Sequence, residues 1–311
     1  MSKENNGEFD APAKRSGTAE AASRPAGSPA DIEAAEEAAA RQGERDWLRR
    51  RLRRRIAIGL AALLGLSGAA LALLLVLKPE PREVFDGLPG RYTYLEAEQP
   101  GQPHLYMMAA APDDIVLRAD DLPLRQIPAY GINGGFFYEK DLLSIAVMND
   151  EPVNGKPGGY GSGWFNEKYA RGTLVWDGAK RVFSVQVVSS ADELDVPDRN
   201  RYFAQGGVSL NLNDERNWLR ESRKEKLPFA DEARMRSALV YNDEGKLWLI
   251  VTPTACTASN FRAALLGAVP GTGREGIFLD GDGSSQMNAA EAVLTGDSRK
   301  VVQMISISAE R

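Results

Sequence analysis

One segment of the sequence, residues 277–287 (IFLDGDGSSQM), combines carboxylates, hydroxyls and glycines in a way that suits chemistry. An apolar run typical of a buried strand ends at Asp280, and a glycine-broken loop then carries Asp282, Ser284 and Ser285. Carboxylates at the carboxyl end of a strand, beside backbone amides and hydroxyls, suit an anionic or sugar-like ligand. The sequence therefore predicts a binding site in this loop.

Two other interpretations of the same loop stay open. One is a plain polar turn. The other is a calcium loop, because Asp280, Asp282, Ser284 and Glu291 fall at its positions 1, 3, 5 and 12. The sixth position, normally glycine, is Ser285, and a strand-like run precedes the loop, so a helix–loop–helix calcium hand is not expected. A looser divalent-cation site at Asp280 and Asp282, with calcium as the candidate, stays an alternative.

A second segment, residues 129–138 (AYGINGGFFY), breaks an apolar run with Asn133, Gly134 and Gly135. Paired glycines adopt backbone conformations closed to other residues and let a ligand approach the main chain. The Asn133 amide supplies a donor and an acceptor at the bend. The alternative is an ordinary Asn-Gly turn.

Arginines form the third candidate. Arg234 and Arg236 directly precede a predicted strand at 237–241, where a guanidinium can bind a phosphate through two parallel hydrogen bonds. Solvated surface arginines are the alternative. The chain has one cysteine, Cys256, and one histidine, His104, so an internal disulfide, a thiolate zinc cluster and Ser–His–acid chemistry are not expected.

Composition narrows the class of protein further. The 311 residues are 43% hydrophobic and 26% charged, as in ordinary globular proteins, and the net charge is −5. A net negative chain has no overall basic field for nucleic acid, so no nucleic-acid partner is predicted.

The N-terminal part differs from the rest. Residues 1–44 are poor in large apolar side chains, and residues 1–55 together predict a disordered cytoplasmic tail that turns helical from about Asp31. Residues 56–77 form a run of 22 residues without a charge, about 33 Å long as a helix, which predicts a single transmembrane helix in a lipid bilayer. A cleaved signal peptide is the competing interpretation.

Arginines are concentrated before the apolar run. The positive-inside rule then places the N-terminus in the cytoplasm and the C-terminal domain outside, which predicts a single-pass protein of the cell membrane. Residues 78–90, with Pro79 and Pro81, predict a stiff linker. The arginines before the run are Arg41, Arg45, Arg49, Arg50, Arg51, Arg53, Arg54 and Arg55.

Residues 91–311 predict one extracytoplasmic α+β domain, a β-rich mixed sheet with few helices. Short alternating runs are separated by turn residues, and Asp177-Gly178 and the 242–245 turn (NDEG) predict two hairpins. The clearest helix is expected from a cap at Ser259, and another turn or two at 289–294.

Taken in order along the chain, these motifs resemble the phosphodiester glycosidase family. The resemblance covers residues 105–307. It departs from the family at Asp282, where the family has glycine, and an added charge there alters what can approach the loop. The segments that carry it are Ile132-Asn133-Gly134-Gly135-Phe136-Phe137, Asn154-Gly155, Arg236-Ser237-Ala238 and Leu279-Asp280-Gly281-Asp282-Gly283-Ser284-Ser285-Gln286-Met287.

The resemblance implies hydrolysis of a sugar-1-phosphate diester, in envelope or exopolysaccharide glycans, with no required cofactor. On that basis Asp280 is expected as base or electrostatic stabiliser, Arg236 as phosphate clamp and Asn133 as a positioner. Expected substrate-binding residues are Gly134, Gly135, Asp282, Ser284 and Ser285. A non-catalytic glycan-binding or scaffold domain of the same fold is the alternative, and a calcium-stabilised structural domain is a third.

Overall fold

The computed structural model describes residues 29–76 and 83–309; within the first range, side chains are described for 41–45, 47–65 and 68. The chain divides into two compact units, Met1–Glu80 and Pro81–Arg311. The predicted disordered tail at 1–28 and the linker residues 78–82 lie outside the described residues.

The first unit contains one continuous helix, α1 (Pro29–Val76). It begins two residues before Asp31 and runs without a break through the predicted boundary at residue 55. Among the residues that the structure describes, no helix is both long enough and apolar enough to cross a membrane. Residue 77 and the side chains of residues 66, 67 and 69–76 lie outside the described part, so the transmembrane span stays a prediction.

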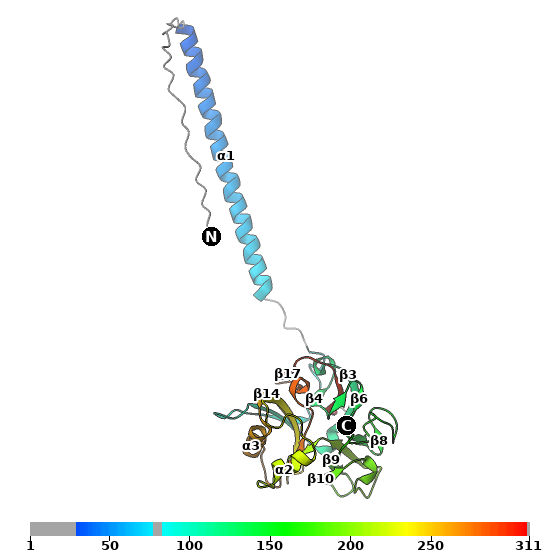
Figure 1. The fold of residues 1–311 in the computed structure, drawn as a ribbon. Helices are drawn as coiled ribbons and strands as arrows, with labels where there is room; N and C mark the ends of the chain where they lie inside the picture. The colour runs from blue at the N-terminus through cyan, green and yellow to red at the C-terminus, as the bar shows by residue number, and fades with distance from the viewer. Residues whose placement is uncertain (1–28, 77–82, 310–311) are drawn as a thin grey trace, which may run out of the picture. The chain divides into compact units, whose positions relative to one another are not determined.

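The second unit is β-rich and carries two helices in its described residues, which confirms the predicted fold class at this level (Figure 1). All pairs between its named strands are antiparallel, and they form three larger sheets instead of one mixed sheet. Short turns join antiparallel neighbours, whereas parallel strands need long crossover connections. The predicted hairpins at 177–178 and 242–245 are confirmed.

The first sheet has six strands in the order β1 (Tyr92–Ala97), β2 (Leu105–Ala110), β14 (Leu247–Cys256), β13 (Arg234–Tyr241), β15 (Glu275–Phe278) and β12 (Val208–Ser209). The second has β10 (Val182–Val188), β9 (Arg171–Asp177), β11 (Tyr202–Gly206), β7 (Ala146–Met148) and β8 (Glu151–Pro152). The third has β17 (Val293–Leu294), β16 (Met287–Asn288), β4 (Tyr130–Asn133), β18 (Val301–Ile307) and β3 (Ile115–Leu122). A small hairpin joins β5 (Phe137–Tyr138) and β6 (Asp141–Leu142).

Successive side chains of a strand point to opposite faces of its sheet. In the first sheet both faces are buried, each against a different core. Along β13, Ala238 and Val240 pack into a core that includes Phe261 of α3 (Ala258–Ala268) and Trp218 of α2 (Trp218–Lys224). Leu239, between them, packs into a second core with residues of β4 and β18. The sheet is thus the central layer, with helices on one face and the third sheet on the other.

Three local expectations differ from the structure. The cap of α3 is Thr257, whose hydroxyl accepts from the Asn260 amide at 3.2 Å, and not Ser259. Both residue types cap helices, so the sequence alone leaves the choice within two positions. The expected helical turn at 289–294 is instead the end of a hairpin between β16 and β17. Phe85, in the predicted linker, is buried against Tyr130, so the second unit begins before residue 91.

Candidate active site

The side chain of Asn133 joins the two segments that the sequence singles out. Asn133 ends β4, and its Nδ2 donates to the main-chain carbonyl of Asp280 at 2.8 Å. The Asp280 amide in turn donates to the Gly134 carbonyl at 3.3 Å. The bend at 133–135 and the acidic loop, 147 residues apart, therefore lie side by side.

Asn133 is 1% exposed, and its other polar atoms are also paired within the protein. Its Oδ1 accepts from the Ser237 hydroxyl at 2.7 Å and from the Gln286 amide at 3.3 Å. The amide thus ties β13 and both ends of the acidic loop together. It fixes the loop from behind and does not line the pocket described below.

Gly134 and Gly135 allow close packing of the chain against Gln303 of β18. A Cβ at Gly134 would lie 2.3 Å from Gln303 Oε1, and a Cβ at Gly135 would lie 2.6 Å from the Ser144 Cβ. The Gly135 amide donates to Gln303 Oε1 at 3.1 Å. In this structure the glycines face protein atoms, and neither lines the pocket.

A pocket of about 610 Å³, measured to its open mouth, lies in front of this junction. Of the predicted site residues, Asp280, Asp282 and Arg236 line it. Arg234 and Arg299 line it as well, and its apolar walls come from Phe136, Leu227, Pro228, Phe229, Met235, Phe278 and Leu279.

Asp280 lines this pocket just beyond the end of β15 and is partly exposed. Burial raises the pKa of Asp280 to about 6, because the carboxylate loses water on becoming enclosed. The nearby Ser284 hydroxyl, the Gly281 amide and the Arg299 guanidinium oppose that rise, while the Asp282 carboxylate adds to it. A carboxylate of this pKa exchanges protons near neutral pH, as a general base or acid must.

Asp282 starts a short 3-10 turn (Asp282–Ser284) with φ of 55°, a left-handed conformation that favours glycine. Its carboxylate pairs with Arg234 Nη1 at 3.0 Å. Arg234 Nη2 pairs with Glu232 at 2.7 Å, and the guanidinium lies over the Phe229 ring, 4.6 Å from its centroid. A carboxylate and an arginine of the pocket are therefore paired with each other.

Arg236 is 6% exposed and directs its donors to main-chain carbonyls. Nε donates to Cys256 at 2.9 Å, and Nη2 donates to Phe229 at 2.8 Å and to Glu232 at 3.0 Å. The arginine thus fixes the lip of the pocket. Arg236 lines the pocket, but three of its five N–H groups are engaged with these carbonyls.

Arg299 is the pocket residue that the sequence analysis missed. It lies just before β18. Its hydrogen bonds to Asp297 raise its pKa, and the charges of Asp280 and Asp282 add to that rise. Nothing in the sequence around it marks a site. Its position follows only from β18 pairing with β4, which places it beside the acidic loop.

Ser284 and Ser285 lie behind the pocket wall. Each is 1% exposed, and neither hydroxyl has a hydrogen-bond partner. Ser284 is near enough to Asp280 to lower its pKa, but outside hydrogen-bonding geometry.

No group of three or more His, Cys, Asp or Glu side chains is placed to hold a metal ion within the described residues. The four residues of the calcium-loop alternative are spread out: Asp282 pairs with Arg234, and Glu291 accepts from the Tyr92 hydroxyl at 2.9 Å.

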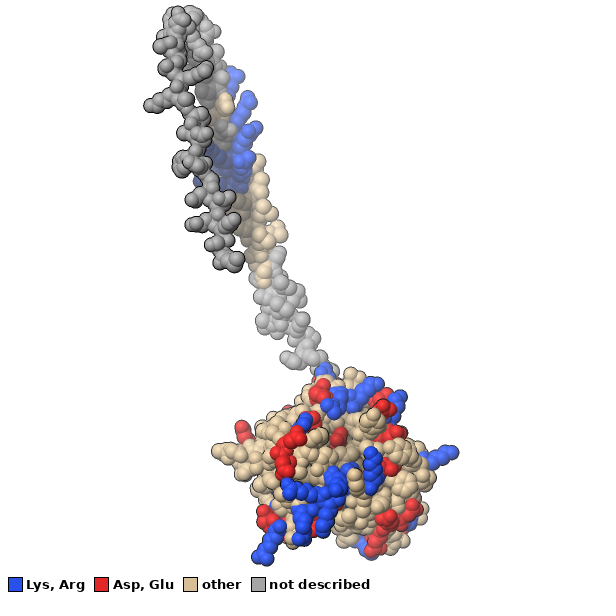
Figure 2. Space-filling view, in the orientation of Figure 1, with Lys and Arg blue, Asp and Glu red and all other residues tan. Residues whose placement is uncertain are grey.

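Several charged groups elsewhere on the second unit are paired. Lys and Arg side chains gather over α2 (Figure 2), but Glu221 binds Arg220 and Lys224, and Asp231 binds Arg223.

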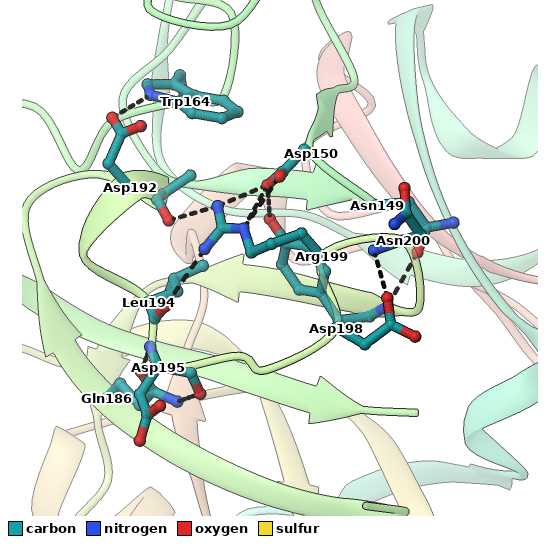
Figure 3. A network of polar contacts seen from close by, with 12 residues as sticks. Asn149, Asp150, Trp164, Gln186, Asp192, Leu194, Asp195, Asp198, Arg199 and Asn200 are labelled. Carbon is teal, nitrogen blue, oxygen red and sulfur yellow. Dashed lines mark hydrogen bonds and ion pairs between the residues drawn. The ribbon is translucent and has the colours of Figure 1, made fainter. Parts of the chain in front are cut away.

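A separate network centres on Asp150, which accepts from Arg199 Nε at 2.9 Å and from the Tyr202 hydroxyl at 2.6 Å (Figure 3). These bonds with Arg199, opposed by burial, lower the pKa of Asp150. The network fixes the loop between β10 and β11.

The chain matches no family model, and no curated protein matches it in sequence. Among solved structures it is similar to the catalytic domain of zebrafish N-acetylglucosamine-1-phosphodiester alpha-N-acetylglucosaminidase, auto-inhibited by its pro-peptide. The TM-score is 0.47 at 14% identity, over 75% of this chain and 94% of that one. It is also similar to a hypothetical protein from Synechocystis, with a TM-score of 0.41 at 14% identity, over 70% of this chain and 61% of that one. Both likenesses are distant.

Proposed function

We propose that the second unit hydrolyses a sugar-1-phosphate diester, releasing the sugar and leaving a phosphomonoester. One observation carries the proposal: a single pocket holds Asp280, whose pKa is raised to about 6, beside the side chains of Arg234, Arg236 and Arg299. A base and cations in one pocket are what cleavage next to a phosphate needs.

In the proposed reaction, water attacks the anomeric carbon and the bond from that carbon to the phosphate oxygen breaks. The bonding electrons stay on the phosphate, and the ionised Asp280 accepts the proton that the water loses. Phosphate is a good leaving group, so little general-acid help is needed at the glycosidic oxygen. In the transition state the same carboxylate offsets positive charge on the sugar ring.

Arg234 and Arg299 are proposed as the phosphate ligands, with Arg236 adding charge from the lip. The side chains of Arg234 and Arg299 are 33% and 46% exposed, and each has a carboxylate partner that a phosphate oxygen would replace. Asn133 serves as a positioning residue, because it holds the main chain of Asp280. Ser284 is proposed to donate to the carboxylate once substrate is bound.

A non-catalytic glycan-binding domain is the second candidate. It is favoured by one observation, that the arginines lining the pocket already have partners in the protein. A domain that binds a neutral glycan needs no unpaired arginine.

Turnover of an activated sugar-1-phosphate diester by the full chain in detergent separates the candidates. Wild type is expected to release the sugar, and Asp280→Asn to reduce kcat by about 10²–10⁴-fold, the usual worth of a positioned base. Asp231→Asn, an equal charge change on a residue that is 74% exposed, is the matched control. Binding without release supports the second candidate, and activity abolished by chelator indicates a required cation.

Membrane anchoring through residues 56–77, with the second unit outside the cell, is proposed on the sequence alone. Retention of the full chain in the membrane pellet after alkaline carbonate extraction tests it. Release into the supernatant would contradict it.

A further inference from the structure

Asp282 is the least expected residue of the pocket. It is a side-chain-bearing residue held at φ of 55°, where glycine would be free of strain, and its carboxylate points at a pocket arginine. A strained residue at a site persists when something depends on it. The question is what a second carboxylate does beside Asp280.

The negative charge of Asp282 repels any anion that enters the pocket and so weakens its binding. Arg234 is paired with Asp282 and Glu232, and Arg299 with Asp297. The pocket thus offers hydrogen-bond donors for phosphate oxygens but little excess positive charge. Such a site suits an anion of one charge better than an anion of two.

We infer that Asp282 is a charge selector, which admits monoanionic phosphodiesters and disfavours dianionic phosphomonoesters. The inference rests on the proposed function and deepens it, because substrate and product of that reaction differ by this one charge. A phosphomonoester carries close to two charges above its second pKa of about 6, whereas a diester keeps one. Asp282 would therefore also favour release of the product.

Binding of two probes without a sugar tests the inference: dimethyl phosphate as diester and methyl phosphate as monoester, at pH 8, by NMR titration of the full chain. Wild type is expected to bind the diester more tightly. In Asp282→Asn the monoester should gain about tenfold relative to the diester, since one repulsive charge at contact distance is removed. Asp282→Gly should show the same gain, and its backbone suits the left-handed conformation.

Asp231→Asn is the matched control, because it removes one negative charge outside the pocket lining, and its binding ratio should equal that of wild type. An unchanged ratio in Asp282→Asn overturns the inference, as does a change seen in the glycine variant alone. If neither probe binds any variant, the inference and the phosphate site both fall. If wild type releases no sugar but Asp282→Asn shifts the ratio of monoester to diester binding, the proposed hydrolysis is overturned. The role of Asp282 in charge selection is then still supported.

Discussion

The Asn133 side chain donates to the main-chain carbonyl of Asp280, at 2.8 Å, and so fixes the backbone of the proposed catalytic carboxylate. The bond does not involve the carboxylate itself, so the position of Asp280 and its protonation are controlled separately. Burial controls the pKa of the Asp280 carboxyl group, and the Asn133 amide controls the position of the Asp280 backbone.

The coupling between Asn133 and its neighbour Ser237 can be measured by a double-mutant cycle. Asn133→Ala should lower the free energy of unfolding by about 3 kcal/mol, because several buried polar groups lose their partner. Ser237→Ala should cost about 1 kcal/mol, and the double variant less than the sum. Ser306→Ala, which removes a hydroxyl bonded to Val116 on β3, is the comparison. Additive effects of Asn133 and Ser237 would contradict the arrangement.

Asp280 should also control how stability varies with pH. Its folded-state pKa of about 6 lies above the unfolded value of 3.8, so between these values the native protein holds a proton that the unfolded chain has released. Its contribution to stability is full below pH 3.8 and is lost as the pH rises through 6. Asp280→Asn should therefore be more stable than wild type at pH 8, by on the order of 2 kcal/mol.

Urea unfolding at pH 4 and pH 8 checks this. The advantage of the variant should shrink toward pH 4, where the wild-type carboxyl is protonated in the native state and partly protonated in the unfolded chain. An advantage independent of pH would mean that the substitution acts by shape and not by charge.

Activity should depend on the same ionisation. As a base, Asp280 works only when ionised, so kcat/KM should rise with pH and level off above an apparent pKa of about 6. A rate profile from pH 4.5 to 8.5, with a substrate that does not ionise in that range, would show it. Activity that falls as the pH rises through 6 would instead make the protonated carboxyl the active form.

Arg236 should stabilise the folded protein through its hydrogen bonds at the lip of the pocket. Arg236→Met removes three hydrogen bonds to the carbonyls of Cys256, Phe229 and Glu232, and unfolding should become easier by about 3 kcal/mol. Arg236→Lys should rescue little, because an ammonium cannot reproduce the planar fork. Thermal and urea unfolding give the measurement.

Arg220→Met, at an exposed pair with Glu221, is the control and should change stability by less than about 1 kcal/mol. If Arg236→Met loses no more stability than this control, the three hydrogen bonds of Arg236 contribute little to the stability of the fold.

Local sequence signals predicted the parts of the fold that depend on neighbours in the chain. The hairpins at 177–178 and 242–245 combine alternating strands with turn residues, and the apolar strand that ends at Asp280 is followed by the loop expected there. The family resemblance places Asn133 and Asp280 in one site, and the structure brings them together. No periodicity in either segment indicates this adjacency.

The rest depended on packing between distant segments. Arg299 enters the pocket only through the pairing of β18, and the donors of Arg236 turn to carbonyls that lie near it only in the folded lip. That Gly134 is needed to fit Gln303 follows from the pairing of β4 with β18, which alternating patterns alone do not specify. The sequence thus indicates where the chain turns, but it does not indicate which distant residues the turn will contact.

The contact between Gly135 and Gln303 joins positions 168 residues apart, and Arg299 comes from the same late stretch of the chain. Closing so long a loop is slow, since its entropy is lost before the contact repays it. During synthesis the domain would hold its hairpins well before it has a working cavity. Premature termination a dozen residues short would remove β18, which pairs with both β3 and β4, and would leave those two strands with exposed edges.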